Sequence, residues 1–306
     1  MANIAWIGLG HMGGPMSTNL VAAGHVVRGV DPMPEARDAA AAHGVRVVDS
    51  IAQAVEGADA VFTSLPRSEH VREVYAGDGG VWATAPAGAL LLDTSTVDVE
   101  TSRWCHDGST SRGFRFVDSP VSGGIAGAAA GSLTFMLGGE PDATADAREL
   151  VEPMAGHVFE LGGPTLGIAA KLANNLMLFV SLLGVSEGAA LADTLGLDPA
   201  KFFEVASVSS GESWPLRTWY PAPGVVETSP ANRNYDATFT TVLAEKDLSF
   251  AVDAGTAAGL PMPASRIALD QFERLIDEGL GGKDASLIAK FATADGGVAG
   301  FTPPTE

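Results

Sequence analysis

The chain has 306 residues, 46% hydrophobic and 18% charged, a composition typical of a globular protein with a well-buried core. Its formal net charge of −19 argues against a nucleic-acid partner, because such proteins draw their affinity from basic residues that contact phosphates. A single cysteine, Cys105, excludes an intrachain disulfide and a thiolate metal site, and we expect no metal. The length is enough for two domains.

The first residues carry a dinucleotide-binding pattern. The apolar run of residues 3–7 predicts a buried strand, and it leads into the turn Gly8-Leu9-Gly10-His11-Met12-Gly13 and an apolar-periodic helix. A second strand, residues 26–30, ends at Asp31. Strand, glycine turn, helix, strand and acid together are the context that the dinucleotide fingerprint requires. The alternative is an ordinary βαβ unit whose glycines serve packing only.

The glycines and the acid have separate expected roles. Gly8 permits the tight turn, Gly10 lets the backbone approach a pyrophosphate at the helix N-terminus, and Gly13 allows helix and strand to pack closely. Asp31 would accept hydrogen bonds from the ribose hydroxyls and repel a 2′-phosphate, and no arginine follows it to receive one. The pattern therefore predicts NAD rather than NADP.

Helix-like and strand-like segments alternate as far as residue 161. Further strands are predicted at residues 45–48, 60–65, 89–92, 114–117, 133–137 and 157–161, and helices at 34–43, 51–55 and 142–154. Repeated βα units imply a mostly parallel, doubly wound sheet. Ligands of such sheets bind beyond the carboxyl ends of the strands. Here those ends are the glycine turn, Asp31, Leu65-Pro66, Thr94-Ser95-Thr96 and residues 119–124.

The pattern changes near residue 163, and no further strand is expected. Residues 167–195 predict one long helix, apolar nearly all round, as expected of a helix buried between two units. Helices are also predicted at 241–258 and 264–278, with an irregular proline-rich stretch at 215–234. We therefore expect an α/β fold: a Rossmann-like doubly wound domain (1–163), a long interdomain helix, and an all-α domain for substrate binding and oligomerisation (164–306).

One ammonium and two carboxamides interrupt the apolar run at the start of that helix. Lys171, Asn174 and Asn175 are spaced i, i+3 and i+4, so they should share one face. A lysine is almost never fully buried without a partner, which favours a working group. The alternative is that Lys171 reaches out to solvent while the asparagines bond to backbone.

The choice of catalytic base narrows to this lysine. The six histidines all lie at or before His157, so the helical half supplies none, and no cysteine–histidine zinc arrangement exists. Burial and a nearby nicotinamide cation would both lower the pKa of Lys171 from its ordinary value and make it a better base.

A second polar segment, residues 118–124, follows a predicted strand. The Ser122 hydroxyl and the backbone N–H groups exposed by Gly123 and Gly124 would form an anion-binding concavity suited to a carboxylate. The alternative is a plain strand-to-loop turn.

Residues 8–16, 118–124 and 171–175 resemble, in order and spacing, the three signatures of the β-hydroxyacid dehydrogenase family. The C-terminal half is similar to the branch that oxidises 3-hydroxyisobutyrate in valine breakdown, through residues 209–214, 220–225, 230–231 and 246–248. The similarity covers nearly the whole chain. One departure is His70, which stands where an asparagine can contact the cofactor, and we leave it out of the site.

The resemblance implies roles for individual residues. Lys171 would be catalytic, together with Asn175. The substrate would contact Ser122, Gly123, Gly124, Asn174 and Trp214. The cofactor would contact Gly8, Leu9, Gly10, His11, Met12, Gly13, Asp31, Leu65, Pro66, Thr96 and Lys246. Without the resemblance, Trp214 could be a core residue and Lys246 a solvated charge.

The expected activity is the NAD-dependent oxidation of (S)-3-hydroxyisobutyrate to methylmalonate semialdehyde, with Lys171 as general base and, in reverse, general acid. The rivals are a family member acting on tartronate or succinic semialdehyde, and a catalytically silent dinucleotide-binding scaffold. The first strand begins almost at Met1, and no apolar segment is flanked like a membrane span. We therefore expect a cytoplasmic protein with no membrane partner. The long apolar helix and the resemblance imply a homodimer or homotetramer with the helical domain at the contact.

Overall fold

The computed structural model describes residues 1–303, and the chain divides into two compact units after Lys171. The strands of the first unit are β1 (Asn3–Ile7), β2 (Val26–Val30), β3 (Arg46–Val47), β4 (Ala60–Thr63), β5 (Leu90–Asp93), β6 (Arg115–Asp118), β7 (Val121–Ser122), β8 (Leu133–Gly139) and β9 (Ala155–Glu160). Its helices are α1 (Gly13–Ala22), α2 (Pro34–Ala42), α3 (Ile51–Val55), α4 (Ser68–Ala76), α5 (Val81–Thr84), α6 (Val99–Thr110), α7 (Gly124–Ala130), α8 (Pro141–Val151) and the 3₁₀ turn η1 (Glu152–Met154).

Helix α9 (Leu166–Thr194) crosses the division between the units. The second unit continues with α10 (Pro199–Ala206), α11 (Trp214–Trp219), η2 (Pro230–Arg233), α12 (Thr241–Ala257), α13 (Pro263–Asp277) and η3 (Ala285–Ala292). Two isolated bridges apart, the described part of this unit contains no strand.

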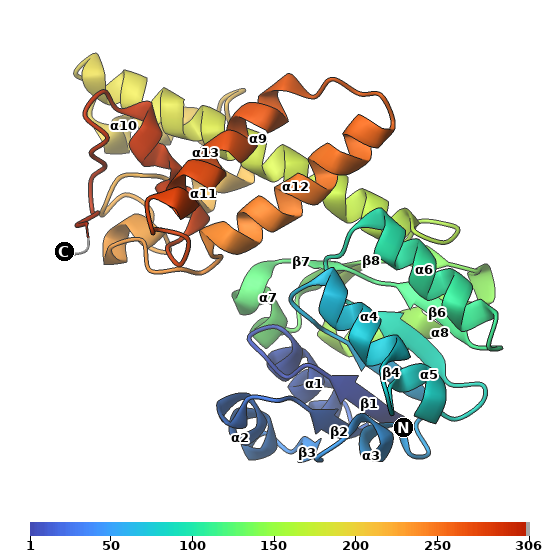
Figure 1. Cartoon of the computed structure of the whole chain (residues 1–306). Coiled ribbons are helices and arrows are strands. Elements are labelled where there is room, and N and C mark those ends of the chain that lie inside the picture. The colour runs from blue at the N-terminus through green and yellow to red at the C-terminus, as the bar shows by residue number, and fades with distance from the viewer. Residues whose placement is uncertain (304–306) are drawn as a thin grey trace. The chain divides into compact units, whose positions relative to one another are not determined.

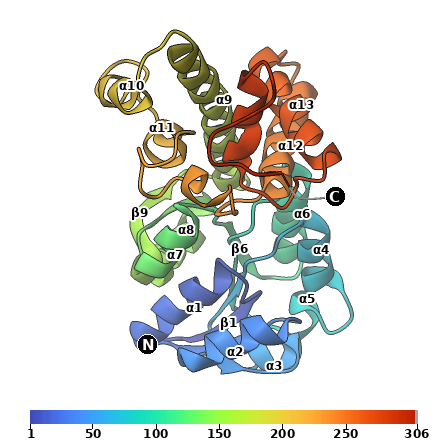
Figure 2. The ribbon, with the colours of Figure 1, turned by 90° about the vertical axis from the view of Figure 1, so that its left-hand side faces the viewer.

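The sheet of the first unit has the order β3-β2-β1-β4-β5-β6-β8-β7, with β9 beside β8. The six strands from β3 to β6 are parallel, and β8 runs antiparallel to β6 and β7. Helices cover both faces: Figure 2 shows β1 and β6 between α1, α7 and α8 on one side and α4, α5 and α6 on the other. This confirms the predicted doubly wound, mostly parallel fold.

Because both faces are covered, the central strands are apolar without alternation. Every residue of β4 and β5 is buried, and the rings of Trp6 and Phe62 stack across β1 and β4 with centroids 4.9 Å apart. In the sheet, β2 lies on one side of β1 and β4 on the other. After β3, the chain crosses over to form β4. Strand order thus reverses between β1 and β4, and ligands of doubly wound sheets bind at such a point.

A buried carboxylate ends β5. Asp93 is 3% exposed, and its Oδ1 accepts hydrogen bonds from Thr63 Oγ1 at 2.7 Å and Ser95 Oγ at 2.6 Å. Burial raises the pKa of Asp93 to about 6, although these hydrogen bonds act in the opposite direction. Between about pH 4 and 6 the native state therefore holds a proton on Asp93 that the unfolded chain has released. The stability that this group contributes at low pH is lost as the pH rises through this range.

We expect Asp93→Asn to remove that pH dependence. The neutral amide keeps an acceptor for Thr63 and Ser95 without the cost of a buried charge. Above pH 6 the variant should be more stable than the wild type by roughly 3 kcal/mol, and the difference should shrink as pH falls from 6 to 4. Chemical denaturation of both proteins between pH 4 and 8 measures it; a difference that grows toward low pH would contradict the assignment.

The second unit is helical around its own core. Phe179 and Leu182 of α9 lie in one cluster with Leu248 of α12 and Phe272 of α13, all at most 1% exposed, and α12 and α13 pack together (Figure 1). The prediction that residues 215–234 are irregular is partly wrong. Pro215 occupies the first turn of α11, where its missing N–H costs nothing, and the Ser213 hydroxyl caps that helix.

Helix α9 is less buried than its composition predicts. Only 33% of its most apolar 18-residue window is buried within the chain, and Met177 and Leu191 are 68% and 61% exposed. The expectation of a helix buried all round is therefore wrong. Among the described residues, α9 alone is long and apolar enough to cross a membrane; a core helix of a soluble protein passes the same test, and Phe179 and Leu182 place one face of α9 in a core.

Candidate active site

The turn between β1 and α1 has two kinds of glycine. Gly8 has φ +96°, and a Cβ on it would collide with the main-chain oxygen of Ser64 beyond β4. A Cβ on Gly13 would collide with the main-chain oxygen of Gly8. Around Gly10, by contrast, no atom lies within 4 Å of an added Cβ. Packing therefore explains Gly8 and Gly13, while it does not require a glycine at position 10.

Asp31 ties this turn to β2. The Leu9 amide donates to its Oδ2 at 2.7 Å and the Met33 amide to its Oδ1 at 2.8 Å, and Asp31 is only 8% exposed. The carboxylate is thus fixed at the carboxyl end of β2, beside the open position at Gly10. A carboxylate there, a glycine turn and the N-terminus of α1 fit a dinucleotide, whose ribose hydroxyls and pyrophosphate need those groups.

The ends of β4 and β5 lie along the same edge, because both strands run parallel to β1. The Leu65 amide donates to Ser95 Oγ at 2.8 Å, which joins the two strand ends. Leu65 and Thr96 are half-buried, and Pro66 and His70 are exposed. The first unit thus gathers most of the residues expected to contact the cofactor: Gly8, Leu9, Gly10, His11, Met12, Gly13, Asp31, Leu65, Pro66 and Thr96.

The segment after β6 contains the residues that we expect to bind the substrate carboxylate. Ser122 is half-buried at the end of β7, and Gly123 and Gly124 are exposed with φ values of +134° and +65°. These backbone conformations are ones that side chains rarely adopt. The two glycines therefore take backbone conformations that larger residues would strain, next to the half-buried Ser122.

Burial divides the three polar residues at the start of α9. Lys171 is 8% and Asn175 2% exposed, whereas Asn174 is exposed. The i, i+4 pair shares the buried side, and Asn174 reaches Asn175 from the surface, its Nδ2 3.2 Å from Asn175 Oδ1. Lys171 is therefore not a solvated charge.

In the second unit, the neighbour of Asn175 is an acid to which the sequence alone gave no role. Asn175 Nδ2 donates to Asp247 Oδ2 at 2.7 Å, and Lys246 Nζ lies 3.0 Å from Asp247 Oδ1. Asp247 and Lys246 are 4% and 8% exposed, so Lys246 is not a solvated charge. Asp247 fixes the orientation of the Asn175 amide and the Lys246 ammonium together. Its signals in the sequence were its adjacency to Lys246 and its place in the segment 246–248, which carries part of the resemblance.

Trp214 is 52% exposed at the first position of α11 and packs edge-on against Trp219, with ring centroids 5.0 Å apart. It is therefore not a core residue. Cys105, by contrast, is fully buried, and burial raises the pKa of its thiol far above the ordinary value. A thiol held in that state is inert.

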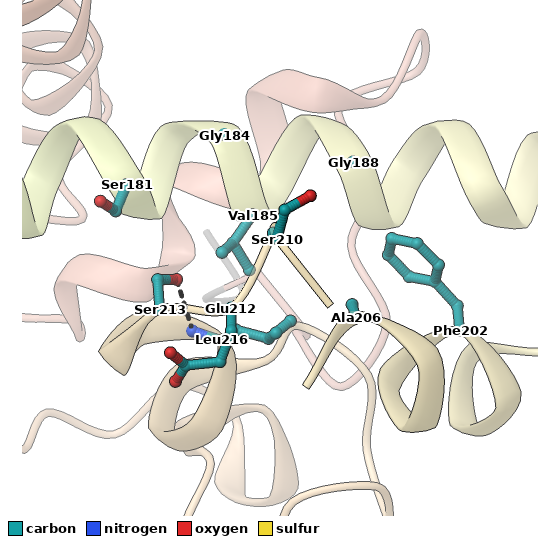
Figure 3. Close-up of a pocket in the computed structure, with 11 residues that line it drawn as sticks. Ser181, Gly184, Val185, Gly188, Phe202, Ala206, Ser210, Glu212, Ser213 and Leu216 are labelled. Atoms are coloured by element: carbon teal, nitrogen blue, oxygen red, sulfur yellow. Dashed lines mark hydrogen bonds between the residues drawn. The ribbon is translucent and has the colours of Figure 1, made fainter. Parts of the chain in front are cut away.

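A pocket of about 470 Å³ lies in the second unit between α9, α10 and α11 (Figure 3). Val185, Phe202 and Leu216 supply much of its apolar wall. Its single charged lining residue is Glu212, an anion. A carboxylate substrate needs a cation or clustered N–H donors, so this pocket does not suit one.

The strand order, the glycine turn and Asp31 define a Rossmann-type dinucleotide-binding protein. Two family models match the chain: the NAD binding domain of 6-phosphogluconate dehydrogenase over residues 3–163, and the NAD-binding domain of NADP-dependent 3-hydroxyisobutyrate dehydrogenase over residues 166–292.

Known proteins narrow the class. A probable 3-hydroxyisobutyrate dehydrogenase of Mycobacterium tuberculosis is 44% identical over 274 residues, 90% of this chain and 92% of the relative. An NAD-dependent L-serine dehydrogenase of Pseudomonas aeruginosa is 40% identical over 290 residues, 95% and 97% of the two chains. The solved structure of the Mycobacterium tuberculosis 3-hydroxyisobutyrate dehydrogenase with L-serine has a TM-score of 0.89 at 42% identity, covering 96% of this chain and all of that one.

The chain therefore belongs to the β-hydroxyacid dehydrogenase family, and it is a 3-hydroxyisobutyrate dehydrogenase-like, NAD-dependent oxidoreductase. This confirms the resemblance seen in its three motifs.

Proposed function

We propose that this enzyme oxidises (S)-3-hydroxyisobutyrate to methylmalonate semialdehyde, with residues 1–163 binding NAD and residues 164–306 serving the substrate and oligomerisation. The observation that carries the proposal is the burial of Lys171 on a largely apolar helix. The names of the relatives support the substrate.

In the proposed reaction, the substrate carboxylate docks on the Ser122 hydroxyl and the backbone N–H groups of Gly123 and Gly124, with Asn174 and Trp214 as further contacts. The substrate hydroxyl faces Lys171, whose neutral amine takes its proton, and in the reverse direction the ammonium so formed returns it. Asn175, oriented by Asp247, holds the reacting groups in place without adding charge. NAD, when bound, supplies the acceptor for the hydride.

The cofactor would lie along the edge formed by the glycine turn, Asp31, Leu65, Pro66 and Thr96, with Lys246 contributing from the helical domain. Asp31 already uses one lone pair on each oxygen for backbone amides, and its remaining lone pairs can accept from ribose hydroxyls. A 2′-phosphate at the same place would meet a carboxylate. We therefore propose NAD over NADP.

L-Serine is the second candidate substrate. It is named for one relative and is present in the structure of another, and it differs from 3-hydroxyisobutyrate in carrying an ammonium instead of a methyl group at C2. Both acids offer the same carboxylate and primary hydroxyl to Ser122 and Lys171. The choice between them depends on what surrounds C2.

A substrate panel with both cofactors tests the proposal. Absorbance at 340 nm is followed with (S)-3-hydroxyisobutyrate, L-serine, and, in the reductive direction, tartronate and succinic semialdehydes. Among the substrates, we expect the highest kcat/KM for (S)-3-hydroxyisobutyrate. We expect kcat/KM with NAD to be at least about tenfold higher than with NADP, a ratio that corresponds to about 1.4 kcal/mol. A higher kcat/KM for L-serine would reassign the substrate, and a preference for NADP would refute the role of Asp31.

We further propose a cytoplasmic homodimer or homotetramer with the helical domain at the contact. The exposed Leu166, Met177 and Leu191 form an apolar stripe along α9 and support this proposal. Monomeric proteins rarely leave such a stripe exposed to water. Light scattering should give a mass of two or four chains. Leu191→Glu, on α9, should shift it toward the monomer, whereas Leu260→Glu, an exposed leucine after α12, should not. A monomeric wild type would contradict the proposal.

A further inference from the structure

The last residue of β6 joins the sheet to the start of α9. Asp118 is 3% exposed, and its Oδ2 accepts a hydrogen bond from the Ile168 amide at 2.7 Å. Its Oδ1 accepts from the Thr165 amide at 3.0 Å and lies 2.6 Å from Nε2 of His106. One carboxylate thus holds two amides at the beginning of α9.

The space around this carboxylate admits only glycine. A Cβ on Gly138 would lie 2.7 and 2.9 Å from the two carboxylate oxygens of Asp118, and a Cβ on Gly167 would lie 2.8 Å from Oδ2 and 2.6 Å from the main-chain oxygen. All four distances are shorter than those that real Cβ atoms show. The two glycines therefore let β8 and α9 close on the carboxylate, which has no room to turn.

Thr165, the residue before α9, has a strained backbone conformation and is hydrogen-bonded to the Asp118 carboxylate. Thr165 has φ +69°, in the left-handed region that non-glycine residues seldom occupy. Its amide is one of the two that donate to Asp118. His106, 5% exposed on α6, shares the other side of Oδ1, and its ring packs edge-on against Phe116 with centroids 4.7 Å apart. The carboxylate is thus fixed from three elements.

Lys171 follows Ile168 by three residues, about one turn of helix. Since a helix transmits a shift along its first turns, the anchor at Ile168 also sets where the Lys171 side chain leaves the helix. We propose that Asp118, held by His106, is a positioning residue for Lys171. Asp118 also opens the segment that ends at Ser122 to Gly124, so the proposed substrate-carboxylate contacts and the proposed base start from one residue. This inference rests on the proposed role of Lys171.

Asp118→Asn tests this proposal. The asparagine amide has the size of the carboxyl group, but its N–H₂ group would face one of the two backbone N–H donors, Thr165 or Ile168, and that hydrogen bond would be lost. We expect kcat to fall about 10- to 100-fold, as displacements near 1 Å of a reacting group do. The KM for NAD should change by less than about twofold. The primary deuterium isotope effect on kcat should rise, because hydride transfer becomes slower relative to product release. Amide hydrogen exchange of residues 165–171 should become faster.

Asp284→Asn is the matched control. Asp284 is a fully buried carboxylate that accepts from the amides of Thr238, Phe239 and Ser286 in the second unit. This variant should lower Tm and leave kcat within about twofold, with exchange at 165–171 unchanged. If Asp118→Asn fails to fold, His106→Gln replaces it, because it removes the ring donor and leaves both amide bonds. For His106→Gln we expect a kcat loss of about 3- to 10-fold with the same rise in isotope effect.

Two results would overturn the inference. Faster exchange with unchanged kcat and isotope effect would make Asp118 a structural residue only. Unchanged exchange at 165–171 would show that it does not hold the start of α9. Should the wild type oxidise no member of the substrate panel, the proposed function fails, and the exchange comparison of Asp118→Asn with Asp284→Asn still decides whether the carboxylate anchors the helix.

Discussion

Replacing Lys171 by alanine should lower kcat by about 10²- to 10⁴-fold, the contribution that a positioned acid–base group makes. The lysine is only 8% exposed on α9, so bulk solvent does not supply another base in its place. In the variant, the substrate hydroxyl therefore lacks the group that takes its proton. NAD affinity should change little, since the glycine turn and Asp31 lie on other elements. Steady-state kinetics and calorimetric NAD titration measure the two quantities.

Lys201→Ala is the control for this prediction, because it removes an exposed lysine of α10 and should leave both quantities unchanged. Adding a small primary amine such as methylamine should restore part of the activity of Lys171→Ala, because the variant leaves a space of that size. The same amine should not raise the activity of the wild type. A kcat within about tenfold of the wild type would remove Lys171 from the chemistry.

Replacing Gly10 by alanine should weaken NAD binding by at least about tenfold, or about 1.4 kcal/mol, without destabilising the protein. The structure leaves open space where the new methyl group would stand, so unfolding should shift by no more than about 0.5 kcal/mol. The methyl group would occupy the approach of the pyrophosphate to the backbone. Calorimetric titration with NAD and chemical denaturation separate the two effects.

Two other glycines give the comparison. A Cβ on Gly13 would collide with the backbone of Gly8, so Gly13→Ala should destabilise the protein by about 1–3 kcal/mol. Gly282→Ala, at an exposed site in the second unit with the same open space, should change neither stability nor NAD affinity. If Gly10→Ala binds NAD as the wild type does, the turn serves packing only, which is the alternative that the sequence left open.

Local patterns predicted much of the first unit. Strand, glycine turn, helix and acid between residues 3 and 31 form a contiguous stretch, and their relation is fixed by hydrogen bonds between near neighbours, such as Leu9 to Asp31. The long helix was equally clear, because 29 mostly apolar residues without a proline leave few alternatives. Helices α4, α5, α6 and α7 were not predicted, and α6 shows why. Its apolar residues are sparse, and it is held by the Asp98 cap on Thr101 and by packing against the sheet.

The sequence by itself determined the class of fold, the dinucleotide turn and Asp31, because each follows from local patterns of strands, helices and glycines. The burial of Lys171 was left open by the sequence and came from the structure. Only the tertiary structure decided that Asn174 is exposed while Asn175 reaches Asp247, seventy-two positions on. It alone joined Asp118 to His106 and the start of α9, and left the apolar stripe of α9 uncovered. Such pairings depend on which elements meet in space, and sequence spacing carries no record of that.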